Sequence, residues 1–179
     1  RAMRLHPAGH SLALDLRGKL FTMPLWEGAV RQIGQADGVR YRFGQWLADG
    51  RTLIAVSDAS GEERIEQHDT TGVRSFEADL GHVSSLRAAP QGRWVAVANH
   101  RNQLLLGDLG EPESVGDSAF QVLDHSDAGR IEDLAWSADG QWLAYSFQVT
   151  ARQRAIKLCE LATRRCTLVT QPEFRDYCP

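Results

Sequence analysis

Short apolar stretches alternate with polar, glycine-containing turns along the whole chain, and this pattern recurs four times. The turns are marked by Gly9, Gly50, Gly92 and Gly140, which are spaced by 41, 42 and 48 residues. After its glycine, each copy continues through an apolar stretch, a polar stretch, a second apolar stretch and a more polar one. A period of about 40 to 50 residues with several short strands per unit is typical of β-propeller blades. The pattern therefore predicts an all-β fold of four-stranded antiparallel sheets and no helices.

The pattern also predicts where the strands lie. First strands are expected immediately before the turns, at 40–46, 83–89 and 131–136, with 174–179 beginning another. The later strands are expected at 12–16, 52–57, 94–99 and 143–147, then at 19–24, 64–68, 103–108 and 155–161, with fourth strands such as 73–78 and 166–170. The approximate units are 6–36, 37–80, 81–126 and 127–172, and 173–179 starts a further one.

On this division, the first unit begins at its second strand. Residues 174–179 would then either complete that unit and close a ring of four blades, or begin the next blade of a larger ring. Propellers contain about four to eight blades. We favour an incomplete arc of a larger propeller, whose open faces and sheet edges would promote association.

Four of the five tryptophans keep register with the repeat. Trp46 and Trp136 occupy equivalent positions before their turns, and Trp94 and Trp142 do so after theirs. An aromatic ligand platform is one interpretation. The favoured interpretation is packing between blades, because large aromatic rings supply much of the area that such faces bury.

Composition narrows the classes of protein. Apolar residues make up 42% and charged residues 24% of the 179 residues, which is ordinary for a globular domain. The net charge of −3 gives no basic surface for nucleic acid. No apolar run approaches the roughly 20 residues of a membrane span, and the first residues carry no apolar secretory segment, which favours a cytoplasmic protein.

The three cysteines do not form a disulfide framework. Cys159 and Cys166 lie symmetrically about an expected turn at Ala162-Thr163, so that they would face each other across a hairpin. For a cytoplasmic protein the expectation is two reduced, half-buried thiols rather than a disulfide.

No catalytic, metal or cofactor motif is present. The chain has no Gly-x-Ser-x-Gly elbow and no phosphate-binding glycine loop, and its six histidines form no metal-ligand pattern. His6 and His10 have helical metal spacing, but Pro7 and Gly9 between them exclude a helix. The acidic clusters at 58–63 and 124–127 are interpreted as solvated turns rather than calcium ligands.

Charged residues in the first strands are the remaining candidates for a site. They would stand next to the axis of a propeller, and they are Arg40, Arg42, Arg87, Glu132 and Asp133. One interpretation is a polar channel that admits a peptide or another extended ligand, with Arg40, Arg42, Arg87 and Asp133 as its lining. The alternative, which the residues alone favour, is that these charges reach solvent at strand ends or pair across blades.

Several segments resemble the propeller region of bacterial tricorn-type proteases. The specific ones read Gly-Lys-Leu-Phe-Thr-Met-Pro-Leu-Trp-Glu-Gly at 18–28, Gly-Val-Arg-Tyr-Arg at 38–42 and Trp-Leu-Ala-Asp-Gly-Arg at 46–51, and the likeness continues through 56–64. The stretch 136–140 is shared more widely, with TolB-like and prolyl-oligopeptidase-like propellers. The resemblance covers essentially the whole chain, but only 18–64 is specific.

This resemblance implies a large cytoplasmic serine protease that trims peptides and assembles as a homo-oligomer. In that family two tandem propellers precede a PDZ-like domain and a catalytic core that holds the catalytic serine and histidine. No residue of this chain corresponds to either of them, so no catalytic residue is carried over. The resemblance implies a segment at the junction of the two propellers, or an arc of the second one.

Two hypotheses follow. The first is a non-catalytic segment that gates or channels peptides to a catalytic core elsewhere in the parent protease. The alternative is an independent propeller module of the TolB or WD-repeat kind that binds a protein partner. A prolyl-oligopeptidase-like parent is a weaker third option, because the stretch 23–28 argues against it.

Overall fold

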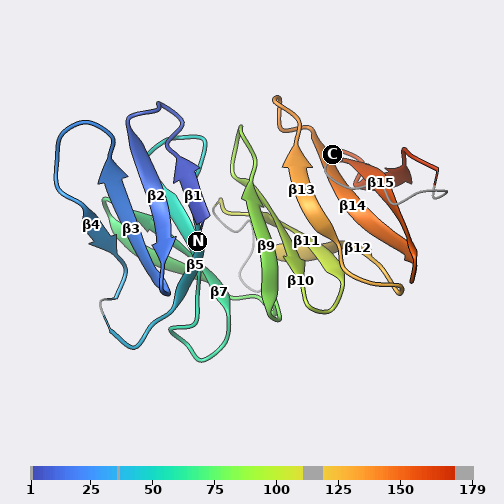
Figure 1. The fold of residues 1–179 in the computed structure, drawn as a ribbon, viewed down its shortest axis with the longest axis horizontal. Coiled ribbons are helices and arrows are strands. Elements are labelled where there is room, and N and C mark those ends of the chain that lie inside the picture. Colours follow the sequence, from blue (N-terminus) through green and yellow to red (C-terminus); the bar gives the residue numbers. More distant parts are fainter. Residues whose placement is uncertain (1, 36, 111–118, 172–179) are drawn as a thin grey trace. The chain divides into compact units, whose positions relative to one another are not determined.

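The protein is built entirely of β-strands where the structure describes it. A computed structural model describes residues 2–35, 37–110 and 119–171. These residues form sixteen strands in four antiparallel sheets of four strands each, which confirms the predicted all-β fold (Figure 1). Among the described residues, none forms a helix of the length and apolar character needed to cross a membrane. The chain divides into two compact units, Arg1–Asp79 and Leu80–Pro179.

The first unit contains two sheets, each formed by consecutive strands. Sheet 1 has the strands β1 (Ala2–Leu5), β2 (Ser11–Leu16), β3 (Lys19–Pro24) and β4 (Arg31–Ile33) in that order. Sheet 2 has β5 (Tyr41–Trp46), β6 (Leu53–Ser57), β7 (Arg64–Asp69) and β8 (Gly72–Phe76).

The second unit repeats this arrangement. Sheet 3 has β9 (Val83–Ala88), β10 (Trp94–Asn99), β11 (Gln103–Asp108) and β12 (Phe120–His125). Sheet 4 has β13 (Glu132–Trp136), β14 (Trp142–Thr150), β15 (Gln153–Glu160) and β16 (Arg165–Leu168).

One sequence expectation about the strands is wrong. Sheet 1 does not begin at its second strand, because β1 pairs antiparallel with β2, with Met3 opposite Leu14 and Leu5 opposite Leu12. The register explains why this short segment is a strand: its two large apolar side chains share one face with the leucines of β2. The further strand expected at 173–179 lies outside the described residues.

The repeated glycine turns have a common geometry. At Gly50 the backbone φ is 63°, and its N–H donates to the carbonyl of Leu47 at 3.1 Å. The corresponding bonds of Gly9 and Gly140 measure 2.8 and 2.9 Å. A positive φ is strained for residues with a Cβ, so the repeat retains glycine at these positions. Asp49 fixes the turn further, because its Oδ1 accepts the N–H groups of Arg51 and Thr52, the two residues after Gly50.

In both units, equivalent positions of the repeat form the core between the two sheets. Ala13 and Leu20 of sheet 1 pack with Tyr41, Leu53 and Ala55 of sheet 2. Ala96, Ala98 and Leu104 of sheet 3 pack with Leu143 and Tyr145 of sheet 4 in the same way. The earlier sheet contributes the residue four positions after its turn glycine, an alanine in both cases, and the later sheet contributes the leucine three positions after its own.

The tryptophans divide into packed and exposed positions. Trp46 packs half-buried on the core of the first unit, and Trp136 does so in the second, where its Nε1 donates to the Arg87 carbonyl at 3.1 Å. The expected packing between sheets is therefore confirmed for this pair. Trp142 is 37% exposed, and Trp26, which is out of register with the repeat, is 85% exposed.

A disulfide joins the last two strands of sheet 4. Cys159 of β15 and Cys166 of β16 are direct cross-strand partners with their Cα atoms 4.0 Å apart, and their sulfurs are bonded. The prediction that they face each other across a hairpin is correct, but the expectation of two reduced thiols is wrong. Directly opposite residues of an antiparallel pair bring their Cβ atoms close together, within reach of a disulfide.

The disulfide gives a testable prediction. Cys166→Ser is expected to lower the free energy of unfolding by about 2 kcal/mol, because the bond closes a loop of sequence separation 7 in the unfolded chain. Chemical denaturation of the oxidised protein and of the variant measures this difference. Intact mass without reductant is the control, because the oxidised chain is two hydrogens lighter than the reduced one. Two free thiols in the chain isolated without reductant would contradict the assignment.

Candidate functional site

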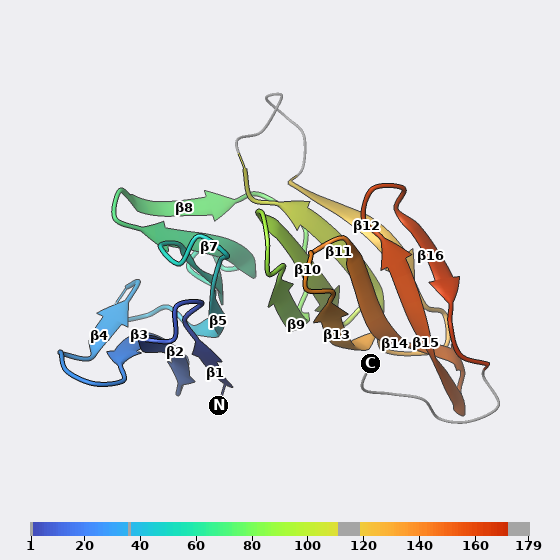
Figure 2. The ribbon, with the colours of Figure 1, turned by 90° about the horizontal axis from the view of Figure 1, so that it is seen from above.

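The candidate channel residues belong to the first strands of the sheets. The strands β1, β5, β9 and β13 each lie at one edge of their own sheet, as Figure 2 shows for β5 and β9. An edge strand presents unpaired backbone groups that another chain can pair with. In β5, β9 and β13 the ladder with the second strand is interrupted by a bulge, which bends the strand and redirects its side chains.

Two of these bulges contain a residue in the left-handed backbone region. Phe43 has a φ of 58° and Asp133 a φ of 55°, and each stands seven residues before the glycine of its turn. Non-glycine residues rarely adopt this conformation. The preceding residues, Arg42 and Glu132, are therefore also equivalent, and the repeat places charges of opposite sign at one position of sheets 2 and 4.

Arg42 forms an ion pair within its own sheet. Its guanidinium contacts the carboxylate of Glu63, which immediately precedes β7, and the two side chains are only 19% and 15% exposed. The guanidinium also lies 5.0 Å from the ring centroid of Phe43. Arg42 is thus held against sheet 2 by two interactions.

Arg40 precedes β5 and is anchored through its backbone. Its N–H donates to Asp58 Oδ1 at 2.7 Å, and its carbonyl accepts the N–H of Asp58 at 3.3 Å. The Arg40 residue is exposed. This local pairing fixes the start of the strand, while the guanidinium extends from a surface position.

The candidate residues of the second unit also have partners. Arg87 Nη1 donates to the carbonyl of Leu86 at 3.1 Å, and Asp133 Oδ2 accepts the hydroxyl of Ser146 at 2.8 Å. Glu132 pairs with Arg154 of β15 at 2.6 Å. Arg40 and Arg42 therefore lie together in the first unit, and Arg87 and Asp133 lie on the neighbouring strands β9 and β13 of the second.

Sheet 2 contains a buried polar cluster that was not predicted from the sequence. Tyr41, Ser57, Glu66 and His68 come from three adjacent strands and are between 1% and 7% exposed. His68 Nε2 lies 3.1 Å from Glu66 Oε2, and the Tyr41 hydroxyl accepts the N–H of Gln35 at 3.0 Å. Glu66 and His68 are two residues apart on a strand, and that spacing was the available signal that they share a face.

Burial and pairing shift the pKa values in this cluster in opposite directions. Burial, reinforced by the neighbouring Glu66 carboxylate, raises the pKa of the Tyr41 hydroxyl. Burial also acts to raise the pKa of Glu66, but the interactions with His68 and Ser57 outweigh it and lower that pKa below its usual value. Because these side chains are shielded from solvent, the cluster joins the strands of sheet 2 and offers no reactive group to a substrate.

A second cluster joins sheets 3 and 4. Asp124 Oδ2 accepts the hydroxyl of Tyr145 at 2.5 Å and the ammonium of Lys157 at 2.7 Å. Burial, followed by the Asp124 carboxylate, raises the pKa of Tyr145 far above its usual value. Within residues 2–35, 37–110 and 119–171, no group of three or more histidine, cysteine or acidic side chains is arranged to hold a metal ion.

The whole chain, residues 1–179, matches the family model described as the tricorn protease second beta propeller domain. The chain belongs to this family. The match confirms the tricorn resemblance, and of the two placements considered for the segment it agrees with the second propeller.

Curated tricorn proteases are similar over almost the whole chain. The tricorn protease homolog 1 of Streptomyces coelicolor is 30% identical over 93% of this chain and 16% of its own length. The tricorn protease homolog of Saccharolobus solfataricus is 27% identical over 96% of this chain and 15% of its own length. This tricorn propeller segment therefore spans less than a fifth of these relatives.

Solved structures agree on the fold. The crystal structure of the tricorn protease superposes with a TM-score of 0.80 at 19% identity, covering 98% of this chain and 18% of that one. TolB from Acinetobacter baumannii gives a TM-score of 0.71 at 17% identity, covering 97% of this chain and 45% of that one. At these identities the likeness concerns the β-propeller fold alone.

Proposed function

We propose that this tricorn propeller segment is a non-catalytic part of a cytoplasmic, homo-oligomeric serine protease and that it gates or channels peptides toward a catalytic core outside these residues. The family match over residues 1–179 carries the proposal. The lack of a nucleophile motif in the sequence agrees with a role in substrate access rather than in bond cleavage.

The proposed channel lining consists of Arg40, Arg42, Arg87 and Asp133. These residues stand in or just before the first strands of three different sheets, and charges of both signs occur among them. An extended peptide carries a positive amino end, a negative carboxyl end and unpaired backbone groups, so a polar lining with exposed strand edges suits it. A passage too narrow for a folded domain would protect folded proteins from cleavage.

The pairing of Arg42 with Glu63 bears on this role. A guanidinium held by a carboxylate and an aromatic ring has little freedom left to lose when a peptide arrives, so it would act as a fixed charge. The proposal therefore treats Arg42 as a preorganised element of the lining.

In the parent protease, Arg42→Ala and Arg87→Ala are each expected to change kcat/KM for peptides that pass the channel by up to about tenfold, which corresponds to about 1.4 kcal/mol. Stability should fall by no more than about 1 kcal/mol for Arg87→Ala, whose guanidinium donates a hydrogen bond to the Leu86 carbonyl. Arg42→Ala should cost more, because it removes the ion pair of the largely buried Glu63 carboxylate. Steady-state kinetics on peptides of increasing length, together with thermal unfolding, measures both effects.

Arg64→Ala is the matched control. Arg64 lies on β7, the third strand of sheet 2, away from the proposed lining, and pairs with Glu77. This control should leave peptide kinetics unchanged. Equal loss of folding in both first-strand variants, or unchanged kinetics in both, would refute the channel proposal.

A further inference from the structure

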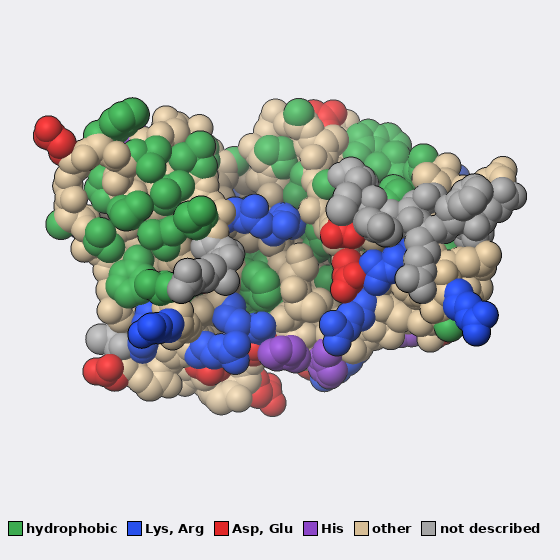
Figure 3. Space-filling model, viewed as in Figure 1, with side chains coloured by type: hydrophobic (Ala, Val, Ile, Leu, Met, Phe, Trp, Pro, Cys, Tyr) green, Lys and Arg blue, Asp and Glu red, His purple; other side chains and the backbone are tan. Residues whose placement is uncertain are grey.

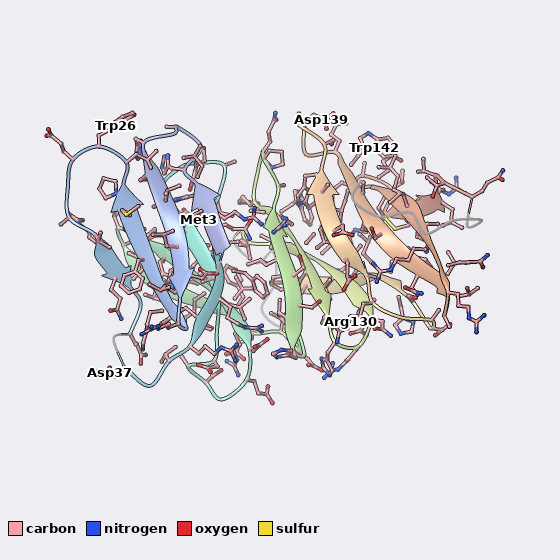
Figure 4. The ribbon with its side chains drawn as sticks, in the orientation of Figure 1. Met3, Trp26, Asp37, Arg130, Asp139 and Trp142 are labelled. Atoms are coloured by element: carbon pink, nitrogen blue, oxygen red, sulfur yellow. A yellow bond between two sulfur atoms is a disulfide. The ribbon has the colours of Figure 1, made fainter. Side chains whose placement is uncertain are left out.

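The disulfide lies on the face of sheet 4 that packs against sheet 3. Leu143 of β14 is the cross-strand partner of Cys159, and both belong to the core that these two sheets share. The other face of sheet 4 carries the Glu132–Arg154 ion pair, and Figure 3 shows acidic and basic side chains over β13 and β14. Figure 4 draws the bonded sulfurs in yellow against the ribbon of sheet 4. The bond therefore belongs to an interface that the second unit forms within itself.

Cys166 fastens β16 to this core. Among the four residues of β16, Arg165, Thr167 and Leu168 are exposed, whereas Cys166 is half-buried. Its side chain packs beside Leu123 of β12 in the neighbouring sheet, and its Sγ lies 4.0 Å from the Leu123 carbonyl oxygen. The hold of β16 on the core therefore depends mainly on one side chain, and that side chain is bonded to β15.

Opening the bond requires room inside a packed core. Two thiol sulfurs meet at van der Waals contact, which is well beyond a bond length, so they must move apart on reduction. Cys159 is 1% exposed, and closely packed interiors do not provide such space without moving their neighbours. Cys166 is half-buried on an edge strand, so its sulfur is the one that can move outward. Reduction is therefore expected to loosen β16 while the core around Leu143 stays packed.

The same core holds one residue of the proposed channel lining. Trp136 packs on this core together with Cys166, and its Nε1 donates to the Arg87 carbonyl at 3.1 Å. The indole thus joins β13 to β9, and the packing around it changes when Cys166 moves outward. On the proposed function, on which this step rests, the thiol state alters how firmly Arg87 is held.

The location proposed for the parent protease gives the bond a role. Disulfides are rare in the cytoplasm, and those that do occur there are usually catalytic or redox-sensing. The two cysteines do not form a Cys-x-x-Cys redox motif, which argues against the catalytic role. The bond closes a loop of sequence separation 7, and short loops contribute less to stability than long ones, so the unit can remain folded without it. Sensing is thus the role that fits.

We propose that the Cys159–Cys166 pair is a reversible thiol switch that sets the order of β16 and, through Trp136, the hold on Arg87. A glutathione thiolate attacks the more exposed sulfur, that of Cys166, forms a mixed disulfide and displaces Cys159 as a thiolate, which takes up a proton. A second glutathione thiolate attacks the sulfur of the bound glutathione, forms glutathione disulfide and releases Cys166, which is also protonated. Two electrons thus pass from two glutathione molecules to the protein, and glutathione disulfide reverses both steps.

Site-specific thiol labelling and hydrogen exchange on the full-length parent protease test the switch. The protein is equilibrated with reduced or oxidised glutathione and alkylated, and trypsin, which cuts after Arg164 and Arg165, separates the two cysteines for mass spectrometry. Reduced glutathione should open the bond in the folded protein. Backbone amides of residues 165–168 should then exchange about tenfold faster, because the strand opens locally, whereas those of β10 should keep their rates.

Two substitutions serve as controls. Cys166→Ser should exchange at the fast rate in either glutathione buffer, and Cys178→Ser, the matched control at the third cysteine, should respond as the native protein does. A bond that opens only when the protein unfolds, or exchange in β16 that is independent of the thiol state, would overturn the switch. A response that persists in Cys166→Ser or is lost in Cys178→Ser would do the same.

Peptide kinetics separate this proposal from the channel itself. Arg87→Ala tests the channel in the oxidised protease, whereas reduction of the native protease should lower kcat/KM for long peptides about threefold, because a less firmly held Arg87 is less preorganised. Kinetics that respond to Arg87→Ala but not to reduction would overturn the regulation proposed here and leave the channel proposal standing. Labelling and exchange need no substrate, so they test the switch even where the channel proposal fails.

Discussion

Leu143→Ala is expected to lower the free energy of unfolding of the second unit by about 2 to 5 kcal/mol. Leu143 is 2% exposed and packs among Ala96, Leu104 and Tyr145, so removing its side chain leaves a cavity between sheets 3 and 4. Both sheets contribute to this core, and neither can close the space without moving its backbone. Urea denaturation followed by tryptophan fluorescence measures the loss.

Leu168→Ala provides the matched comparison. Leu168 lies on β16 of the same sheet but is 47% exposed, so its truncation should cost less than about 1 kcal/mol. If the two variants unfold at the same denaturant concentration, Leu143 does not occupy the core described above.

Gly44→Ala is expected to cost the first unit about 1 to 3 kcal/mol. Gly44 stands in the bulge of β5, and its N–H donates to both carboxylate oxygens of Asp15, at 2.9 and 3.1 Å. A Cβ at this position would lie 2.1 Å from Leu20 Cδ1 and 2.7 Å from Asp15 Oδ1. The substitution would therefore push sheet 2 away from sheet 1 and weaken this hydrogen bonding.

A double-mutant cycle separates the steric cause from others. Leu20→Ala removes the atoms nearest to the new Cβ. The double variant Gly44→Ala/Leu20→Ala should therefore lose about 1 kcal/mol less free energy of unfolding than the two single variants lose together. Thermal unfolding of the four proteins gives this coupling. Strict additivity would show that the close approach of Leu20 is not what makes glycine necessary at position 44.

The fold was largely predictable because its signals are local. Glycine turns at a regular spacing and alternating strands repeat four times, and strands such as Lys19–Pro24 and Trp94–Asn99 have the bounds that the sequence predicted. The first strand of sheet 1 was not predicted because Ala2–Leu5 has only two large apolar residues, Met3 and Leu5. Its identity depends on pairing with β2, which is a property of the sheet rather than of the segment.

Long-range contacts were less predictable for the same reason. Nothing near Gly44 in the sequence indicates Asp15, 29 residues earlier, as the acceptor of its N–H. The expectation of reduced thiols rested on the cellular compartment, whereas the short Cα separation of Cys159 and Cys166 decides whether the bond can form. The hydrogen bond from Gly44 to Asp15 depends on how closely sheets 1 and 2 pack, and the disulfide depends on the register of β15 and β16.

The candidate site was predicted only as a set of charges. The sequence identified Arg42 and Asp133 from their places in the repeat, but their partners Glu63 and Ser146 follow from the fold. The bulges that put Phe43 and Asp133 in the left-handed region leave no pattern that distinguishes them from ordinary strand residues. Peptide channelling therefore stays a proposal that rests on family membership and on charge placement.

The intact mass of the native polypeptide in its source cell tests the central claim most directly. An antibody raised against residues 1–179 would detect it after denaturing separation. Because this measurement depends only on chain length, it is independent of any assay of activity. A band several times larger than 19.9 kDa is predicted, since the tricorn relatives are more than five times as long as the matched segment. A band near 19.9 kDa would contradict a protease segment and favour a small propeller that binds a protein partner.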